Sequence, residues 1–117
     1  MTIDQVIDEI YRRTTDVAGV LVARSDGRSI ASREHDQPDA SAAIAASSLQ
    51  LARRLGDLLG DGSLEEMGVH TTDGYVIVYR LGDRAVLAVF AKPVANLARI
   101  NLVCRELRPN LITSLTH

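Results

Sequence analysis

The stretch that decides the fold is Asp39–Leu59, DASAAIAASSLQLARRLGDLL, which is rich in alanine and leucine and contains no proline. Alanine and leucine are the strongest helix formers, so this composition predicts one long α-helix. We expect Asp39 to be its N-cap, because an aspartate side chain accepts hydrogen bonds from the first free amides. The segment Gly60-Asp61-Gly62 should end the helix, since glycine adopts the left-handed conformation of a helix C-cap.

Two apolar stripes run along this predicted helix and together span roughly 200°, against the ~100° of a helix packed on one sheet. The first stripe consists mainly of small residues: Ala42, Ala45, Leu49, Ala52, Gly56 and Leu59. The second carries larger side chains and is interrupted only by Ser48: Ile44, Leu51, Leu55 and Leu58. A well-buried helix is the simpler interpretation, but so short a chain has no second layer to cover the far stripe. We therefore expect one stripe to pack on a sheet and the other to meet a second copy of the chain.

The residues before this helix predict a helix and a β-hairpin. Apolar residues recur at helical spacing over residues 3–14, and Thr2 with Gln5 has the spacing of a capping box. Residues 17–23 form a short, valine-rich apolar run, which is typical of a strand buried on both faces. The turn Ser25-Asp26-Gly27-Arg28 then leads into a return strand over residues 29–32, and residues 34–38 are a polar linker.

The residues after the long helix predict three strands and a last helix. Residues 64–71 alternate between apolar and polar side chains, with Met67 and Val69 on one face, as in an edge strand. Two further strands cover residues 75–80 and 84–91, separated by turns that contain glycine. The last helix begins near Pro93, its apolar stripe contains Cys104, and Pro109 should end or kink it.

This order of elements predicts a single α+β domain over residues 1–117 with the topology αββαβββα. The first and fifth strands carry the continuous apolar runs, so both should be central and adjacent. The second and third strands are shorter and more polar, and should lie at the edges. With hairpin connections this gives a five-stranded antiparallel sheet in the order 2-1-5-4-3, with helices on both faces.

Composition excludes several classes of function. The net charge is −2 and only 3% of the residues are aromatic, which argues against a nucleic-acid-binding protein. Cys104 is the only cysteine, so neither an internal disulfide nor a cysteine-rich zinc site is possible. No apolar run is long enough to span a membrane, and the N-terminal residues do not resemble a secretion signal. We expect a cytoplasmic protein without membrane insertion.

No pattern of residues predicts catalysis, a cofactor or a metal. The glycines form no phosphate-binding loop, and no Gly-x-Ser-x-Gly motif is present. His35, His70 and His117 lack the spacing of metal ligands, and His70 is expected to point outward from its strand. Glu65 and Glu66 should point to opposite faces of a strand, which is unsuitable for a catalytic carboxylate pair. We expect Cys104 to be buried and unreactive, and the protein not to be an enzyme.

Arginines on the two longer helices have two possible roles. Arg53 and Arg54 either form a solvated helix face, with Arg53 paired to Asp57, or contact an acidic partner. The same alternatives hold for three arginines of the last helix: Arg99, Arg105 and Arg108. The sequence does not separate these roles.

The ordered set of these segments resembles the roadblock (dynein light-chain) family, and within it the short bacterial members that accompany Ras-like GTPases. The resemblance runs from about Ile3 to Leu107. Four segments carry it: Gly19-Val20-Leu21-Val22 through Asp26-Gly27, the alanine-rich helix over residues 42–59, Tyr75-Val76-Ile77-Val78 with residues 85–90, and Val94-Ala95-Asn96-Leu97.

The resemblance implies a roadblock/profilin-like fold and a homodimer formed through the long helix and the third strand. The expected dimer interface consists of Ile44, Ser48, Leu51, Leu55, Leu58, Met67 and Val69. The resemblance further implies that the dimer binds a small GTPase, and it supplies no catalytic residue. The candidate partner-binding residues remain Arg53 and Arg54, from their place on the polar face of the helix. The alternative function is a small-molecule sensor, although the chain is poor in the aromatic residues that line ligand pockets.

Overall fold

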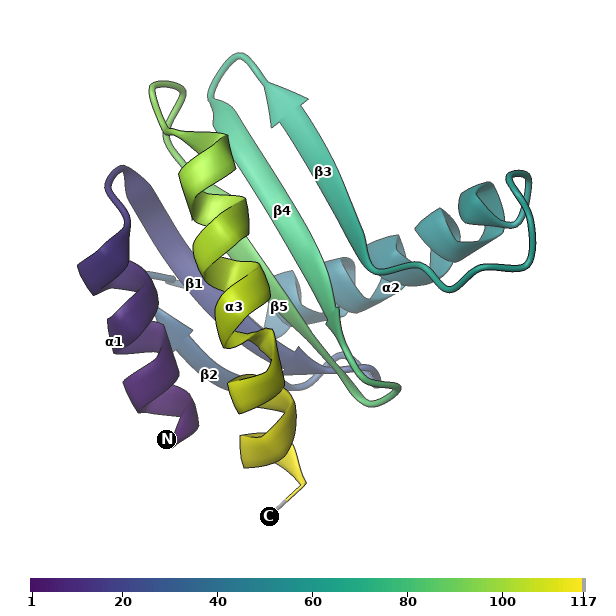
Figure 1. Ribbon diagram of the computed structural model, residues 1–117, viewed down its shortest axis with the longest axis horizontal. Helices are drawn as coiled ribbons and strands as arrows, with labels where there is room; N and C mark the ends of the chain where they lie inside the picture. Colours follow the sequence, from purple (N-terminus) through teal and green to yellow (C-terminus); the bar gives the residue numbers. More distant parts are fainter. Residues whose placement is uncertain (117) are drawn as a thin grey trace.

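The computed structural model describes residues 1–116, which form three helices and five strands. In chain order the elements are α1 (Ile3–Arg13), β1 (Val17–Arg24), β2 (Ser29–Arg33), α2 (Pro38–Gly56), β3 (Glu66–Thr71), β4 (Gly74–Leu81), β5 (Ala85–Ala91) and α3 (Leu97–Leu115). The strands form one antiparallel sheet in the order β2-β1-β5-β4-β3 (Figure 1). The predicted α+β class, topology and strand order are therefore confirmed.

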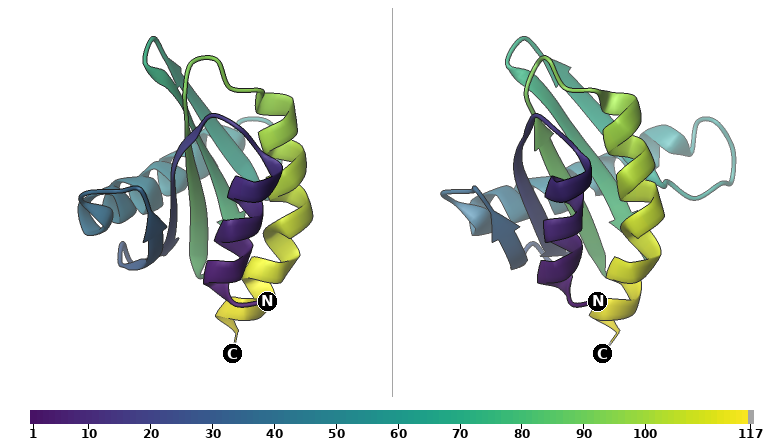
Figure 2. Two further views of the ribbon diagram at one scale, coloured as in Figure 1. Left: turned by 90° about the vertical axis from the view of Figure 1, so that its left-hand side faces the viewer. Right: turned by 60° about the vertical axis from the view of Figure 1, so that its left-hand side comes forward.

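The helices divide between the two faces of the sheet. Figure 2 shows α1 and α3 side by side on one face, while α2 crosses the other face. Both central strands are almost fully buried, since β1 and β5 are covered on both faces. Their burial explains why these two strands have continuous apolar sequences, whereas β3 at the edge does not.

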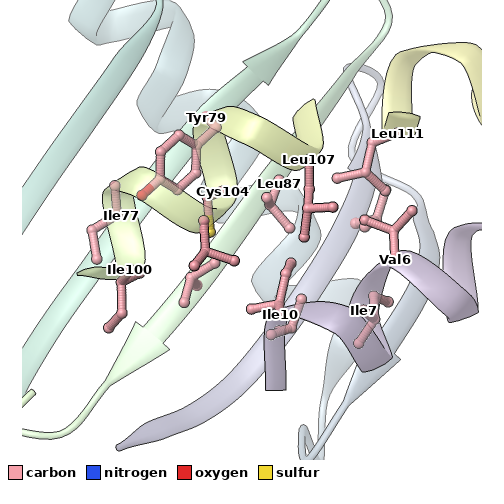
Figure 3. Packing of buried hydrophobic residues seen from close by; sticks show 14 of the residues in the cluster. Val6, Ile7, Ile10, Ile77, Tyr79, Leu87, Ile100, Cys104, Leu107 and Leu111 are labelled. Atoms are coloured by element: carbon pink, nitrogen blue, oxygen red, sulfur yellow. The ribbon is translucent and has the colours of Figure 1, made fainter. Parts of the chain in front are cut away.

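The larger hydrophobic core lies beneath α1 and α3. Val6, Ile7 and Ile10 of α1 point toward Leu107 and Leu111 of α3 and toward the sheet (Figure 3). The predicted helix stripes are thus the buried ones, and the capping box of Thr2 and Gln5 is formed as expected. Cys104 is buried in this core, where burial raises the pKa of its thiol to about 12, so it stays protonated and unreactive.

The smaller core lies between the sheet and α2, and the first stripe of the helix forms it. Ala42, Ala45 and Leu49 are buried against Leu21 and Val86 of the central strands. Small residues at these positions bring the helix close to the sheet, because alanine keeps the backbones near one another. The expectation that one stripe packs on the sheet is confirmed for the first half of α2.

The ends of α2 differ from the prediction. Asp39 is not the N-cap: the helix begins at Pro38, whose fixed φ suits a first helical position, and the Asp39 carboxylate accepts the Ser29 amide at 3.4 Å. The helix ends at Gly56 rather than Leu59, and Leu58 and Leu59 continue in tighter turns through hydrogen bonds to Leu55 and Gly56. Glycine is a weak helix former, which favours an end at this position.

The course of α3 also differs from the prediction. Pro93 lies before the helix, which begins at Leu97 after Asn96, whose side chain accepts the Arg99 amide at 3.1 Å. The expectation that Pro109 ends the helix is wrong, because the helix continues to Leu115. Leu111 is fully buried beyond the proline, and this burial offsets the backbone hydrogen bond that proline cannot donate.

Replacing Pro109 with alanine should stabilise the protein. The exposed proline costs the helix one hydrogen bond without contributing to the core, so Pro109→Ala should raise the free energy of unfolding by about 1–3 kcal/mol in urea denaturation. Pro93→Ala is the matched control, because this exposed proline precedes the helix and its replacement should give no gain. A Pro109→Ala protein no more stable than the original would contradict this account of α3.

Candidate interaction surface

The second half of α2 extends beyond the sheet. A helix of 19 residues is about 28 Å long, whereas five strands span only about 19 Å from centre to centre. Figure 1 shows the consequence: α2 crosses behind the strands, and its C-terminal part projects past β3. Side chains on this projecting part therefore have no sheet of their own chain to cover.

The second apolar stripe of α2 is exposed to solvent. The exposed fractions are 68% for Ile44, 69% for Leu51, 69% for Leu55 and 83% for Leu58. Ser48 does not introduce an unpaired polar group, because its hydroxyl donates to the Ile44 carbonyl at 2.7 Å. A row of exposed large aliphatic side chains at helical spacing is unusual on the surface of a monomeric protein. We call these five residues the α2 row.

The edge strand β3 lies beside the projecting helix. Within the described chain it pairs only with β4, so its outer backbone groups have no strand partner. Met67 packs against the α2-side core, and Val69, which is 43% exposed, lies opposite Val76 of β4 on the same face. The predicted interface residues therefore lie along the exposed side of α2, from Ile44 in the half that covers the sheet to Leu58 beyond the helix end, and on the edge strand β3.

The two arginines of α2 lie in different surroundings. Arg53 lines a cavity of about 260 Å³ together with Asp57, Arg80 and Asp83, whereas Arg54 does not line it. The ion pair between Arg53 and Asp57, one of the two alternatives, is not formed within residues 1–116; the two residues are joined only through the backbone, where the Asp57 amide donates to the Arg53 carbonyl at 3.0 Å. Both side chains remain accessible to a partner.

The arginines of α3 contact the chain itself, a role that the sequence did not indicate. Arg105 binds both carboxylate oxygens of Glu66: its Nε donates to Oε2 at 3.0 Å, and its Nη2 donates to Oε1. Arg108 binds Glu65 and also donates to the Arg80 carbonyl at 2.6 Å. Glu65 and Glu66 therefore both reach α3, and the expectation that they point to opposite faces of the sheet is wrong. Glu65 lies before β3, so the alternation of side chains along a strand does not apply to it. Arg99 donates to the Arg13 carbonyl at 3.0 Å.

These arginines hold the two carboxylates in their charged form. Hydrogen bonds from Arg108 and then Arg80 lower the pKa of Glu65, and the bond from Arg105 lowers the pKa of Glu66. The spacing of Arg105 and Arg108 places both on one helix face, which the sequence could have indicated. The acidic partners lie about forty residues away in sequence, so only the folded chain brings them together.

The remaining candidate residues form no reactive centre. His70 stacks on Tyr75 with ring centroids 4.3 Å apart, pointing outward as expected, and His35 lies 4.9 Å from Phe90. His117 lies outside the described residues. In residues 1–116 no cluster of histidine, cysteine or acidic side chains could hold a metal ion. No helix of that range is long and apolar enough to cross a membrane.

A larger cavity of about 700 Å³ lies beside the β1–β2 and β4–β5 turns and shares Asp83 with the smaller one. Its lining combines charged residues of both signs with apolar ones: Ile3, Arg24, Ser25, Asp26, Ile30, Asp83, Arg84, Ala85, Ser114 and Leu115. Arg24 already pairs with Asp26 at 3.4 Å, so the lining offers little unpaired charge to a ligand. The volume is within the range of ligand sites, but a specific set of converging polar groups is missing from its described lining.

Comparisons with known proteins agree with this architecture. The sequence profile of the Roadblock/LC7 domain matches residues 3–91. No curated protein sequence is significantly similar to the chain. Among solved structures, a Roadblock/LC7 domain from Streptomyces avermitilis has a TM-score of 0.79 at 22% identity, covering 94% of this chain and 98% of that one.

Two other solved structures extend the comparison. An MglB protein with a tetrameric arrangement has a TM-score of 0.86 at 21% identity, covering 95% of this chain and 85% of that one. Profilin IA from Acanthamoeba castellanii has a TM-score of 0.57 at 15% identity, covering 84% of this chain and 86% of that one. At these identities the likeness concerns the fold, and the predicted roadblock/profilin-like architecture is confirmed.

The ion pairs of Glu65 and Glu66 should make the free energy of unfolding depend on pH. The pKa values of both carboxylates in the folded chain lie below the ordinary value of 4.5. The ion pairs therefore contribute fully to the free energy of unfolding above pH 4.5, and this contribution is lost as the pH falls through the folded-state pKa values. The double variant Glu65→Gln and Glu66→Gln should unfold at a lower temperature than the original protein at neutral pH. The two melting temperatures should converge toward roughly pH 3.

Asp61→Asn is the control for this experiment, because Asp61 is exposed and forms no ion pair within residues 1–116. Its melting temperature should follow that of the original protein at every pH. A difference between the double variant and the original protein that stays constant from pH 7 down to roughly pH 3 would exclude a titrating ion pair as its cause.

Proposed function

Because this chain belongs to the Roadblock/LC7 domain family, we propose that it is a non-catalytic homodimer that binds a Ras-like small GTPase in the cytoplasm. The observation that carries the proposal is the exposed α2 row beside the unpaired edge of β3. The proposed dimer interface consists of Ile44, Ser48, Leu51, Leu55, Leu58, Met67 and Val69.

The surface supports a twofold-symmetric dimer. In such a dimer each projecting α2 lies against the other, and the two β3 strands pair edge to edge, so that one sheet runs through both copies. Ile44, Leu51, Leu55 and Leu58 of both copies become buried, each contributing about 1.5–3 kcal/mol on full burial. This burial opposes the loss of translational and rotational freedom on association, which costs about 4–15 kcal/mol. An MglB protein of the same fold forms a tetrameric arrangement, which is a precedent for assembly.

The GTPase is proposed from the family resemblance, and the mechanism requires no catalytic group of this chain. A dimer that binds one nucleotide state of a GTPase more tightly shifts the GTPase toward that state, by an amount set by the ratio of the two affinities. We propose Arg53 and Arg54 as contacts for an acidic segment of the GTPase. Arg54 flanks the α2 row, so a partner that binds across the dimer would meet it from both copies.

Leu55→Glu should convert the dimer to a folded monomer. Leu55 is 69% exposed in the single chain, so glutamate there does not disturb the core. In the dimer the same carboxylate would be buried without a partner, which costs several kcal/mol and abolishes association. Light scattering at micromolar concentration should give a dimer mass for the original protein and a monomer mass for the variant, with unchanged circular dichroism.

The control for Leu55→Glu is Gln50→Glu, which adds the same charge at an exposed position of α2 outside the α2 row. This variant should remain a dimer. A monomer mass for the original protein would refute the homodimer. A dimer mass for Leu55→Glu would place the interface elsewhere on the molecule.

The GTPase hypothesis predicts capture that depends on nucleotide. The tagged protein, incubated with lysate of its source organism, should retain a Ras-like GTPase in GDP or in a non-hydrolysable GTP analogue, but not equally in both. The purified GTPase should then bind the original dimer with different affinities in its two nucleotide states, and bind the Leu55→Glu monomer weakly. Failure of every Ras-like GTPase to bind in either state would favour the small-molecule sensor, which a thermal-shift ligand screen tests.

A further inference from the structure

The start of β3 is fastened to α3 by a cluster of ion pairs. Arg105 holds Glu66, the first residue of the strand, and Arg108 holds Glu65, the residue before it. Arg80 of β4 closes the cluster, because its side chain binds Glu65 at 3.1 Å and its carbonyl accepts Arg108. The side chains of Arg80 and Arg108 are only 19% and 18% exposed, so these contacts are better shielded from solvent than ordinary surface pairs.

Few contacts hold the chain before β3: Leu64 packs against the smaller core, and the Glu65 carbonyl accepts the Arg80 amide at 2.9 Å. After α2 ends, residues 57–65 form no helix or strand, and a side chain at Gly60 or Gly62 would contact nothing. The strand that follows has β4 as its one neighbour in the described sheet. An edge strand of this kind loses backbone entropy when it is ordered and frays easily unless other contacts hold it.

The position of the cluster links it to the surface of the proposed dimer. Its two carboxylates, Glu65 and Glu66, lie in sequence between Leu58, the last member of the α2 row, and Met67 in β3. None of its three arginines belongs to the α2 row or to the exposed edge of β3. The cluster can therefore set the geometry of the interface without being part of it.

We propose that Arg105 and Arg108 are positioning residues for self-association, which fix the start of β3 so that its edge is ready to pair with a second copy. This inference rests on the proposed homodimer. The ordering of β3 occurs within one chain before association, and lowers the conformational cost of forming the dimer.

Twofold symmetry doubles the effect on the binding free energy. Both copies must present an ordered β3. The dissociation constant therefore rises with the inverse square of the fraction of chains in which β3 is ordered. If removal of the ion pairs leaves about one third of each chain with β3 in place, the dissociation constant rises about ninefold.

The test uses the double variant Arg105→Gln and Arg108→Gln in two backgrounds. In the monomeric Leu55→Glu chain, hydrogen exchange of β3 amides should become faster, while exchange in β1 and β5 stays unchanged. In the chain with Leu55, sedimentation equilibrium should show the dissociation constant of the dimer raised about tenfold. The first measurement does not require a dimer, so it tests the cluster even if the original protein is monomeric.

Two further variants separate positioning from a general loss of stability. Arg99→Gln removes a comparable contact of α3, to Arg13, far from β3, and should alter neither β3 exchange nor the dissociation constant. Exchanging the partners, Arg105→Glu with Glu66→Arg, should restore both values toward the original. Unchanged β3 exchange and an unchanged dissociation constant in the double glutamine variant would overturn the proposal, as would equal effects of Arg99→Gln.

Discussion

One constraint underlies the architecture: of the helices in residues 1–116, α2 alone covers its face of the sheet, and it is longer than the sheet is wide. The half of the helix over the strands uses alanines and Leu49 to reach the central strands closely. The half beyond the strands carries leucines that its own chain cannot bury. The same helix therefore completes one core and leaves an apolar surface for another molecule.

The opposite face of the sheet is covered by two helices of the same chain. There α1 and α3 together cover the central strands, so the larger core is closed within the single chain. At the margin of this core the arginines of α3 reach around the start of β3 and neutralise Glu65 and Glu66. Ion pairs thus join the start of the edge strand to α3 on this face, while Leu64 and Met67 pack against the smaller core on the other.

Several residues with reactive or titratable side chains are occupied by contacts within the chain. Cys104 is buried and kept protonated, the carboxylates before and at the start of β3 are bound by arginines, and His70 is stacked on Tyr75. What distinguishes the molecule is the shape and composition of its surface. In the proposed function this surface acts by differential binding, because a surface that prefers one state of a partner shifts the partner toward that state.

The sequence by itself determined the elements, their order in the sheet and the two-stripe character of α2, because periodicity and continuous apolar runs report directly on burial. The sequence did not predict where α2 and α3 begin and end, or which residues form the long-range ion pairs. Asp39 resembled an N-cap, yet Pro38 begins the helix, and Pro109 resembled a stop signal, yet burial of Leu111 carries α3 past it. The contacts of Arg105 and Arg108 depend on how α3 lies beside β3, and no local pattern encodes that placement. Which stripe of α2 faces the sheet, and how far the helix projects, were likewise decided only by tertiary packing, because both depend on the distance between strands and helix rather than on the residues of the helix alone.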